Sequence, residues 1–175
     1  DDERRVKEKL KRILDESRDM LRRSDERVER SVRTLEDALR RSDEKLERIL
    51  KKAEDDGVPR EELERVRRYV KRHHEENRRL LKETREYAER HHRENRRLLK
   101  EDEEKIRRWE EILDRGELDS KELDDAVKKN KKESKETVDR SEKNVKELHD
   151  RNEELLRRSE KNVDDAKRRL DDTSR

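Results

Sequence analysis

Two short stretches of this sequence carry the residue types best suited to chemistry. Each contains two adjacent histidines and an asparagine four residues after the first of them: His73, His74 and Asn77, and again His91, His92 and Asn95. Imidazole and amide groups can bind a metal ion, transfer a proton or take part in a hydrogen-bond network. Residues four apart lie on one face of a helix, so each stretch presents an imidazole and an amide together.

Both stretches belong to a segment that is written twice, because residues 73–83 recur as 91–101 with one difference. The same offset of 18 residues relates 22–26 to 40–44 and 141–145 to 159–163. Eighteen residues make five turns of an undistorted α-helix at about 3.6 residues per turn. A strict heptad pattern would instead force a left-handed supercoil. The repeat therefore predicts nearly straight helices that carry polar layers at a constant spacing.

The histidines have three functional interpretations, which are metal ligand, catalytic base and pH switch, beside a purely structural one. Zinc takes three or four ligands, whereas each repeat offers two and no His-Glu-x-x-His motif is present. A Ser42–His73 dyad is conceivable, but the sequence shows no strained turn, oxyanion hole or glycine-lined cleft. We therefore expect no enzymatic activity, no catalytic residue, no metal and no cofactor.

The composition excludes several classes of partner. The chain is 61% charged and 24% hydrophobic, with 54 basic and 52 acidic residues and no cysteine. Low hydrophobicity alone would suggest disorder, but the apolar residues are periodic and the charges balance. Nucleic-acid binding needs a basic face, and no apolar run approaches the ~20 residues of a membrane span. We expect no nucleic acid, no membrane, no small-molecule substrate and no disulfide. The chain begins with Asp1 and Asp2 and not with Met, which predicts a processed or trimmed product.

Helix-breaking residues are confined to two short segments. Gly57 suits the left-handed position after a helix end, and Pro59 suits the first turn of the next helix. Gly116 suits a second helix end, and Asp119 with Glu122 forms an Asp-x-x-Glu capping box. These signals predict a helix over about 2–55, a loop over 56–59, a helix over about 59–114, a loop over 115–119 and a helix over about 120–173. We expect one domain, residues 1–175.

The apolar residues of each segment, Met20 included, share one stripe of the helical wheel about 120° wide. Short loops make successive helices antiparallel neighbours. The sequence thus predicts an all-α fold, a single-chain antiparallel up-down-up bundle of three long helices. The stripes also contain polar residues: Ser17, Ser24, Ser31 and Ser42 in the first segment, His73, Asn77, Thr84, His91, Asn95 and Asp102 in the second, and Asn130, Ser134, Thr137, Ser141, Asn144, Asn152, Ser159 and Asn162 in the third. The serines of the first segment are expected to be buried. His74 and His92 lie at the edge of the stripe and His149 outside it, and the state of Asp102 is left open.

Folding the chain at its two loops places residue i of the first helix level with about 114 − i on the second and 120 + i on the third. This register predicts two equivalent polar layers about 27 Å apart. One brings Ser24 near His91 and Asn144 with Ser141 close by, and the other brings Ser42 near His73 and Asn162 with Ser159 close by. Asn77 and Asn95 belong to the same buried networks.

Such layers trade stability for specificity. A buried polar group costs a few kcal/mol unless it is hydrogen-bonded, so misregistered packings that leave these groups unpaired are disfavoured. Protonation turns both imidazole nitrogens into donors, which predicts that stability falls at pH values below about 6.5.

Taken with the near-verbatim 18-residue repeats, these features resemble computationally designed helical bundles with buried hydrogen-bond networks. The absence of Phe and Cys and the Arg/Glu/Lys-filled surfaces support the resemblance, which covers the whole chain. It implies a soluble scaffold expressed recombinantly in the cytoplasm, with no natural compartment and no natural activity.

Two function classes remain open. In the first, the chain is a free-standing structural scaffold that requires no partner. In the second, it is a component of a designed homo- or hetero-oligomer, whose partner is itself or a designed helix. The polar networks would then specify the choice of partner or a pH-dependent assembly.

Overall fold

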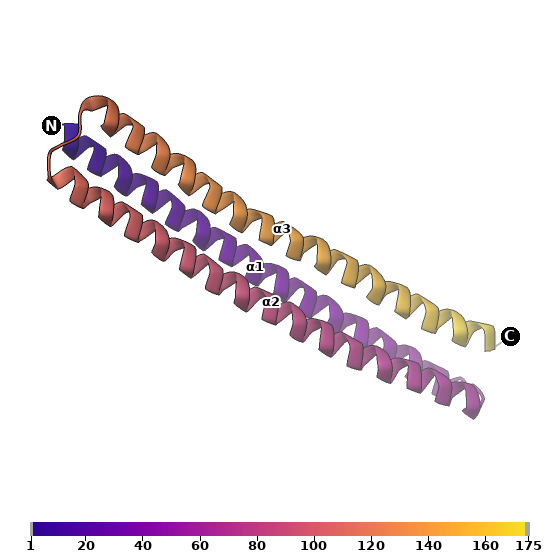
Figure 1. Ribbon diagram of the computed structural model, residues 1–175. Coiled ribbons are helices and arrows are strands. Elements are labelled where there is room, and N and C mark those ends of the chain that lie inside the picture. Colours follow the sequence, from indigo (N-terminus) through magenta and orange to yellow (C-terminus); the bar gives the residue numbers. More distant parts are fainter. Residues whose placement is uncertain (1, 174–175) are drawn as a thin grey trace. The chain divides into compact units, whose positions relative to one another are not determined.

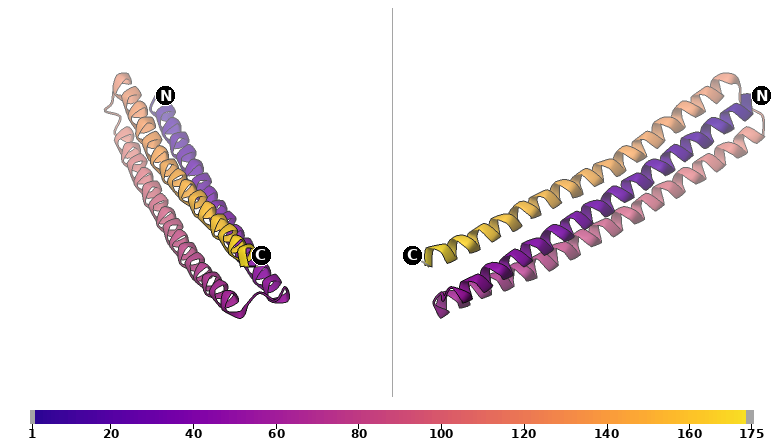
Figure 2. Two further views of the ribbon diagram at one scale, coloured as in Figure 1. Left: turned by 90° about the vertical axis from the view of Figure 1, so that its right-hand side faces the viewer. Right: turned by 180° about the vertical axis from the view of Figure 1, so that it is seen from behind.

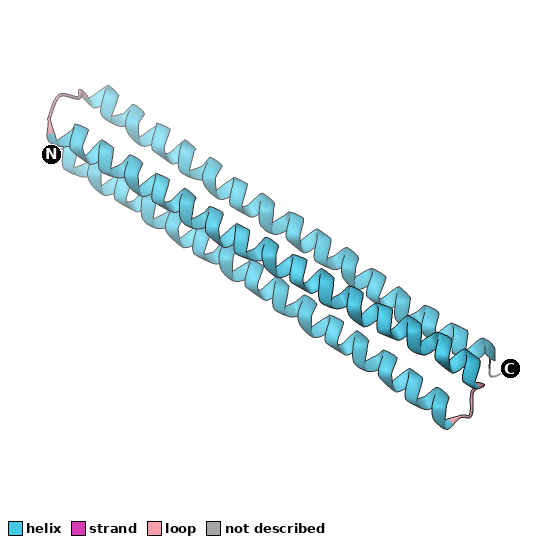
Figure 3. Ribbon diagram, turned by 60° about the horizontal axis from the view of Figure 1, so that its bottom comes forward, coloured by secondary structure: helices cyan, strands magenta, loops and turns pink. Residues whose placement is uncertain are grey.

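A computed structural model describes residues 2–173, and Asp1, Ser174 and Arg175 lie outside the described residues. The expectation of a processed or trimmed product rests partly on Asp1, and to that extent it lies outside the described residues. The described chain forms three helices, α1 (Asp2–Asp55), α2 (Arg60–Asp114) and α3 (Ser120–Thr173), with no strand among these residues. Two short loops connect the helices (Figure 1; loops pink in Figure 3). The all-α prediction is confirmed.

A glycine follows the C-terminal end of α1 and of α2. Gly57 and Gly116 have φ angles of 73° and 68°, the left-handed conformation that lacks a steric penalty only for glycine. The Gly116 N–H donates to the carbonyl of Leu113 (3.1 Å). α2 begins at Arg60, one residue later than expected, because Pro59 occupies the cap, where its carbonyl accepts the N–H of Leu63 (3.0 Å).

α3 begins with the predicted capping contact. The Glu122 N–H donates to Asp119 Oδ1 at 2.8 Å, which satisfies one of the free donors of the first turn. Acidic residues also occupy the first turns of α1 and α2, where they favour the positive end of the helix dipole. Local signals thus account for where α2 and α3 begin.

Contacts along the chain divide it into two compact units. Unit 1 combines Asp1–Val28 with Glu89–Glu147, and unit 2 combines Glu29–Ala88 with Leu148–Arg175. Each unit contains one segment of every helix. Figure 2 shows the three helices in two further views. That the whole chain is a single domain stays a prediction.

Contacts give the helix directions within each unit. In unit 1, Ser17 meets Asp102 and Ser24 meets His91, so residue numbers fall along α2 as they rise along α1. In unit 2, Glu36 meets Arg85 and Ser42 meets His73. α3 runs parallel to α1 in both units, because residue numbers rise together along the two helices. The pairs are Ser24–Ser141 and Arg27–Glu142 in unit 1 and Ser31–Asn152 and Ser42–Ser159 in unit 2. The up-down-up order is confirmed in each unit.

Apolar clusters fill the space between the helix segments. Unit 1 contains a cluster of Val6, Leu10, Ile106, Leu113 and Leu123. Unit 2 contains a cluster of Leu46, Ala53, Leu63, Val66, Val70, Ala166 and Leu170, and another of Leu35, Leu39, Leu80 and Leu155. Burial of apolar area at about 25 cal/mol per Å² is the main favourable contribution to such packing.

The stripes do not predict burial at every position. Met20 is 37% exposed although it belongs to the α1 stripe, and Ser31 is half-buried where we expected burial. At Met20 the reason is an open groove between α1 and α3 in unit 1.

Over residues 2–173 none of the helices has the combination of length and apolar composition needed to cross a membrane.

Candidate functional site

A chain of hydrogen bonds crosses all three helices of unit 1. We name its members the His91 layer: Ser24, Asp25, His91, Asn95 and Ser141. His91 Nε2 lies 3.0 Å from Ser24 Oγ, which lies 2.7 Å from Ser141 Oγ. Ser141 Oγ donates to Asn95 Oδ1 (2.8 Å), and Asn95 Nδ2 donates to Asp25 Oδ1 (2.7 Å). Except for Asp25, every member is at most 3% exposed.

The position of each proton in the His91 layer follows from this geometry. A hydroxyl has one proton to donate, and that of Ser141 is used on Asn95. Ser24 must therefore donate to Ser141, which leaves Ser24 Oγ to accept from His91 Nε2. His91 is then a neutral imidazole protonated at Nε2, and the 3.2 Å approach of Asn95 Nδ2 to this nitrogen is a contact between two donors. His91 Nδ1 is buried and has no hydrogen-bond partner among residues 2–173.

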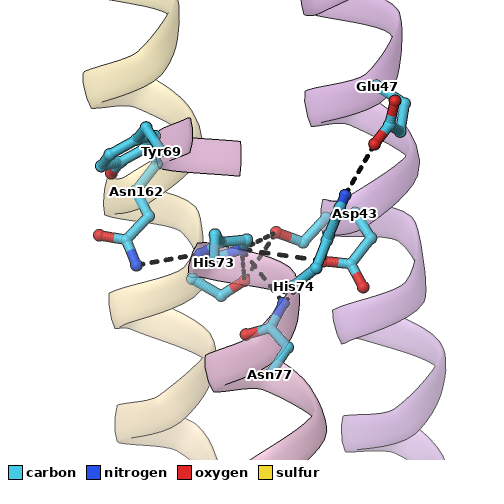
Figure 4. A network of polar contacts seen from close by, with 9 residues as sticks. Asp43, Glu47, Tyr69, His73, His74, Asn77 and Asn162 are labelled. Atoms are coloured by element: carbon cyan, nitrogen blue, oxygen red, sulfur yellow. Dashed lines mark hydrogen bonds and ion pairs between the residues drawn. The ribbon is translucent and has the colours of Figure 1, made fainter. Parts of the chain in front are cut away.

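A second network occupies the equivalent positions of unit 2. We name its members the His73 layer: Ser42, Asp43, His73, Asn77, Ser159 and Asn162. Ser159 Oγ donates to Ser42 Oγ (2.7 Å), which lies 3.3 Å from His73 Nε2. Asn77 Nδ2 donates to Asp43 Oδ1 (2.8 Å). The other ring nitrogen, His73 Nδ1, faces Asn162 Nδ2 at 3.2 Å (Figure 4). His73 thus has neighbours on both nitrogens, unlike His91.

The His73 layer accepts either tautomer. In one arrangement Ser42 donates to Nε2, and Nδ1–H donates to the Asn162 amide turned to present its oxygen. In the other, Nδ1 accepts from Asn162 Nδ2 and Nε2–H donates to Ser42. An amide can supply a donor or an acceptor by rotating through half a turn. The two layers share a sequence pattern and differ in hydrogen bonding.

Two aspartates that the sequence analysis did not assign hold the outer ends of the layers. Asp43 Oδ1 lies 2.8 Å from His74 Nδ1 and 4.0 Å from His73 Nε2, and Glu47 Oε1 lies 2.8 Å from His74 Nε2 (Figure 4). In unit 1, Asp25 Oδ1 lies 2.8 Å from His92 Nδ1. The signal was present, because Asp25 and Asp43 follow the network serines in the repeated segments 22–26 and 40–44.

Tyr69 is a further residue that the sequence analysis missed. Its hydroxyl donates to the backbone carbonyl of Asn162 at 3.1 Å and so fixes the helical turn that presents the Asn162 amide (Figure 4). The available signal was again the repeat, because Tyr69 recurs as Tyr87.

The predicted register needs one correction on α3. Ser24 pairs with Ser141 and Ser42 with Ser159, an offset of 117 and not 120. The serines are therefore the direct partners, and Asn144 and Asn162 lie almost one turn further along. Asn144 Nδ2 donates to Glu94 Oε2 (3.4 Å), and His91 Nδ1 has no partner in the described part of the chain. The equivalent Asn162 of unit 2 has the same offset but lies 3.2 Å from His73 Nδ1, so the offset alone does not separate the two cases. The error arose because only loop positions, and no contacts, set the register.

Burial sets the protonation state of the network histidines. Desolvation lowers the pKa of His91, against the charge of Asp25, which raises it. Desolvation likewise lowers the pKa of His73, against the charge of Asp43. His74 differs: burial lowers its pKa, but its hydrogen bond to Glu47 and the adjacent carboxylate of Asp43 outweigh this, and the pKa is raised. His73 and His91 therefore favour the neutral form, because burial removes the water that would solvate the charged form.

Asp102 is a buried acid, which resolves the question that the sequence left open. It is 5% exposed and accepts a hydrogen bond from Ser17 Oγ at 3.0 Å. Burial raises its pKa, although the hydrogen bond from Ser17 and the charge of Lys105 oppose that shift. The neighbouring Glu101 and Glu133 raise it further.

The geometry of the layers differs from that of known catalytic and metal sites. A serine nucleophile needs a histidine as its base. One imidazole nitrogen must face the serine hydroxyl, and the other must face the carboxylate that orients the ring. Ser24 and Asp25 both lie on the Nε2 side of His91, at 3.0 and 3.8 Å, and Ser24 is 1% exposed. Within residues 2–173, no three His, Asp or Glu side chains are grouped so that they could hold a metal ion.

Comparison with protein-family models, with curated proteins and with solved structures gives no match for this chain.

Proposed function

We propose that this protein is a designed structural scaffold without natural activity, whose two polar layers determine how its helices pair. The observation that supports this proposal best is the continuous chain from His91 through Ser24, Ser141 and Asn95 to Asp25. It links all three helices of unit 1 and uses each hydroxyl proton once.

The physical reason is the cost of an unpaired polar group. Removing one partner from a buried donor or acceptor costs about 1–3 kcal/mol. Sliding one helix by a turn would separate several such pairs in each layer while leaving apolar contacts largely interchangeable. The layers thus act less by stabilising the observed packing than by destabilising its competitors.

The same layers give the scaffold a response to acid. A protonated His91 would present Nδ1–H to a buried position where no acceptor lies among the described residues. Burial already lowers the pKa values of His91 and His73. Protonation therefore opposes the folded packing, and acid is expected to loosen it.

The specificity role can be tested by replacing the His91 layer with apolar residues. The variant S24A/H91L/N95L/S141A removes the buried hydrogen-bonded groups together, which can be neutral or stabilising. Among the side chains of residues 2–173 only Asp25 loses a donor, and it is half-buried and keeps His92 Nδ1 at 2.8 Å. We expect a helical protein that populates more than one packing, seen as extra amide peaks in NMR spectra or as mixed masses in light scattering. A matched control carries four substitutions at exposed positions. A variant with a single set of peaks and an unchanged mass would refute the specificity role.

The second candidate function is a component of an oligomer with itself or with a designed helical partner. The exposed Met20 in an open groove favours it, since Met20 is the single large hydrophobic residue exposed in the described chain. Light scattering at about pH 7.5 and again near pH 5 separates the two candidates. A mass near 21.7 kDa at the higher pH supports the scaffold. A mass that is a multiple of this value at pH 7.5 and falls to 21.7 kDa near pH 5 supports pH-dependent assembly.

A further inference from the structure

An open groove lies between α1 and α3 in unit 1, with a volume of about 580 Å³. Its apolar lining comes from Ile13 and Met20 on α1 and from Val138 on α3. All three belong to the stripes that face neighbouring helices, yet Ile13 and Val138 are half-buried and Met20 is exposed. The stripe in this region is wider than three helices can cover.

The α3 wall of the groove is strongly basic along half of its length. Four of its lining residues are lysines: Lys128, Lys131, Lys132 and Lys135. The carboxylates that line the groove lie elsewhere: Glu16 is on α1, and Asp139 and Glu142 lie a turn or more beyond Lys135. A segment of about 14 residues spans ~21 Å of helix, so the wall has the length of a few helical turns.

Three of the four lysines are specific to this groove and do not follow from the 18-residue repeat. Lys131, Lys132 and Lys135 have His149, Asp150 and Glu153 at the equivalent positions, whereas Lys128 recurs as Lys146. A smaller α1–α3 space in unit 2, of about 210 Å³, overlaps the equivalent region only at Ala38, Leu156 and Glu160. Ala38 and Leu156 take the places of Met20 and Val138 there. Size, exposed apolar surface and basic charge thus coincide in unit 1.

We propose that this groove binds a helix of another polypeptide, one with an apolar stripe flanked by acidic residues. The stripe would cover Ile13, Met20 and Val138, and its glutamates would lie beside the lysine wall. Helices that bind grooves in this way place apolar residues at i, i+3, i+4 and i+7. Complementary charge beside the stripe sets the choice of partner and speeds association. A second copy of this chain, by contrast, would place lysine against lysine when the two 128–135 segments are paired.

The test uses two capped peptides and the full chain. Both peptides have ~21 residues, with leucine along one stripe and alanine on the far face, and they carry either glutamate or lysine beside the stripe. Peptides of this length are long enough to form helix. Fluorescence anisotropy is expected to show that the glutamate peptide binds at least tenfold more tightly than the lysine peptide. This difference should shrink at high salt, because charges at the surface are screened.

Three variants locate the binding. M20E should abolish binding of the glutamate peptide, and K131E/K132E/K135E should reverse the preference in favour of the lysine peptide. K121E/K129E/K143E is the matched control for charge, because these are three exposed lysines of the same helix that do not line the groove. Circular dichroism must show unchanged helix content in each variant.

Three results would overturn the proposal. These are no binding of either peptide, equal binding of both, or a dimer of the free chain that M20E dissociates, which would assign the groove to a second copy. None of these substitutions touches the polar layers, so this inference and the specificity role stand or fall separately.

Discussion

Acidification from about pH 7.5 to about pH 5 is expected to destabilise the protein through His73 and His91. Both are buried, at 4% and 3% exposure, and desolvation lowers both pKa values below the ordinary 6.5. Between the folded and unfolded pKa values the unfolded chain binds more protons than the folded one. Stability therefore rises with pH in this window, and it is lost as the pH falls from about 7 toward the folded pKa.

The size of the effect has an upper bound. An unfolded histidine with a pKa near 6.5 gains about 2 kcal/mol from protonation at pH 5. The folded state gains least when its imidazole stays neutral, so the two residues together contribute at most about 4 kcal/mol. This corresponds to a shift on the order of 1–2 M in the urea midpoint for a slope of about 2–3 kcal/mol per M.

Nearby charges reduce the effect. His91 faces Asp25, Glu94, His92 and Arg27, of which the two acids favour its protonated form. Around His73, Asp43 and Glu76 favour the proton and His74 opposes it. The raised pKa of His74 acts in the opposite sense: its contribution to stability is present at low pH and is lost as the pH rises through the folded pKa.

Urea titrations at the two pH values, monitored by circular dichroism, measure the effect. H91Q and H73Q should each lose part of the pH dependence, and H74Q should increase it. H149Q is the matched control, because the His149 side chain is 60% exposed and pairs with Glu153 on its own helix. Equal midpoints of the parent protein at both pH values would refute the reasoning, as would an H149Q variant that removes the pH dependence.

Three further outcomes are expected. H91Q should reduce the pH dependence more than H73Q, because Asn162 can turn its amide oxygen to a protonated His73 while His91 Nδ1 has no such neighbour in the described chain; the same titrations compare the two. D102N should stabilise the protein by about 1 kcal/mol at neutral pH and by less at low pH, because it removes a buried charge and keeps an acceptor for its hydroxyl donor, which calorimetry at two pH values can measure. G57A should lower the melting temperature by a few degrees, since its φ of 73° costs about 1 kcal/mol with a Cβ.

The sequence predicts the helices well because their determinants are local. Gly57, Gly116 and the Asp119 cap each act within a few residues, and a 3.6-residue period needs no tertiary information. The six polar residues placed at the centre of the α2 stripe are all buried. The wheel identifies the side of a helix that faces its neighbours, whatever the chemistry of the side chain.

Partners across helices are harder to predict because they depend on register to within one residue. An error of three residues on α3 was enough to place Asn144 opposite Ser24, where Ser141 lies. Asp25 and Asp43 were missed for another reason. They lie at the edge of the stripe, where a helical wheel cannot distinguish a solvated carboxylate from one that accepts a network amide.

The two layers cannot by themselves exclude every wrong register. A slip of α2 by one full repeat would bring His91 level with Ser42 and restore one layer from the wrong partners. The residues that break the repeat oppose this slip. Asp102 accepts a hydrogen bond from Ser17, but one repeat along α1 the equivalent position is Leu35. The slip would leave a buried carboxylate against an apolar side chain without its donor, at a cost of several kcal/mol. The repeated residues thus disfavour short slips, and the exception at Asp102 disfavours the slip that the repeat would otherwise permit.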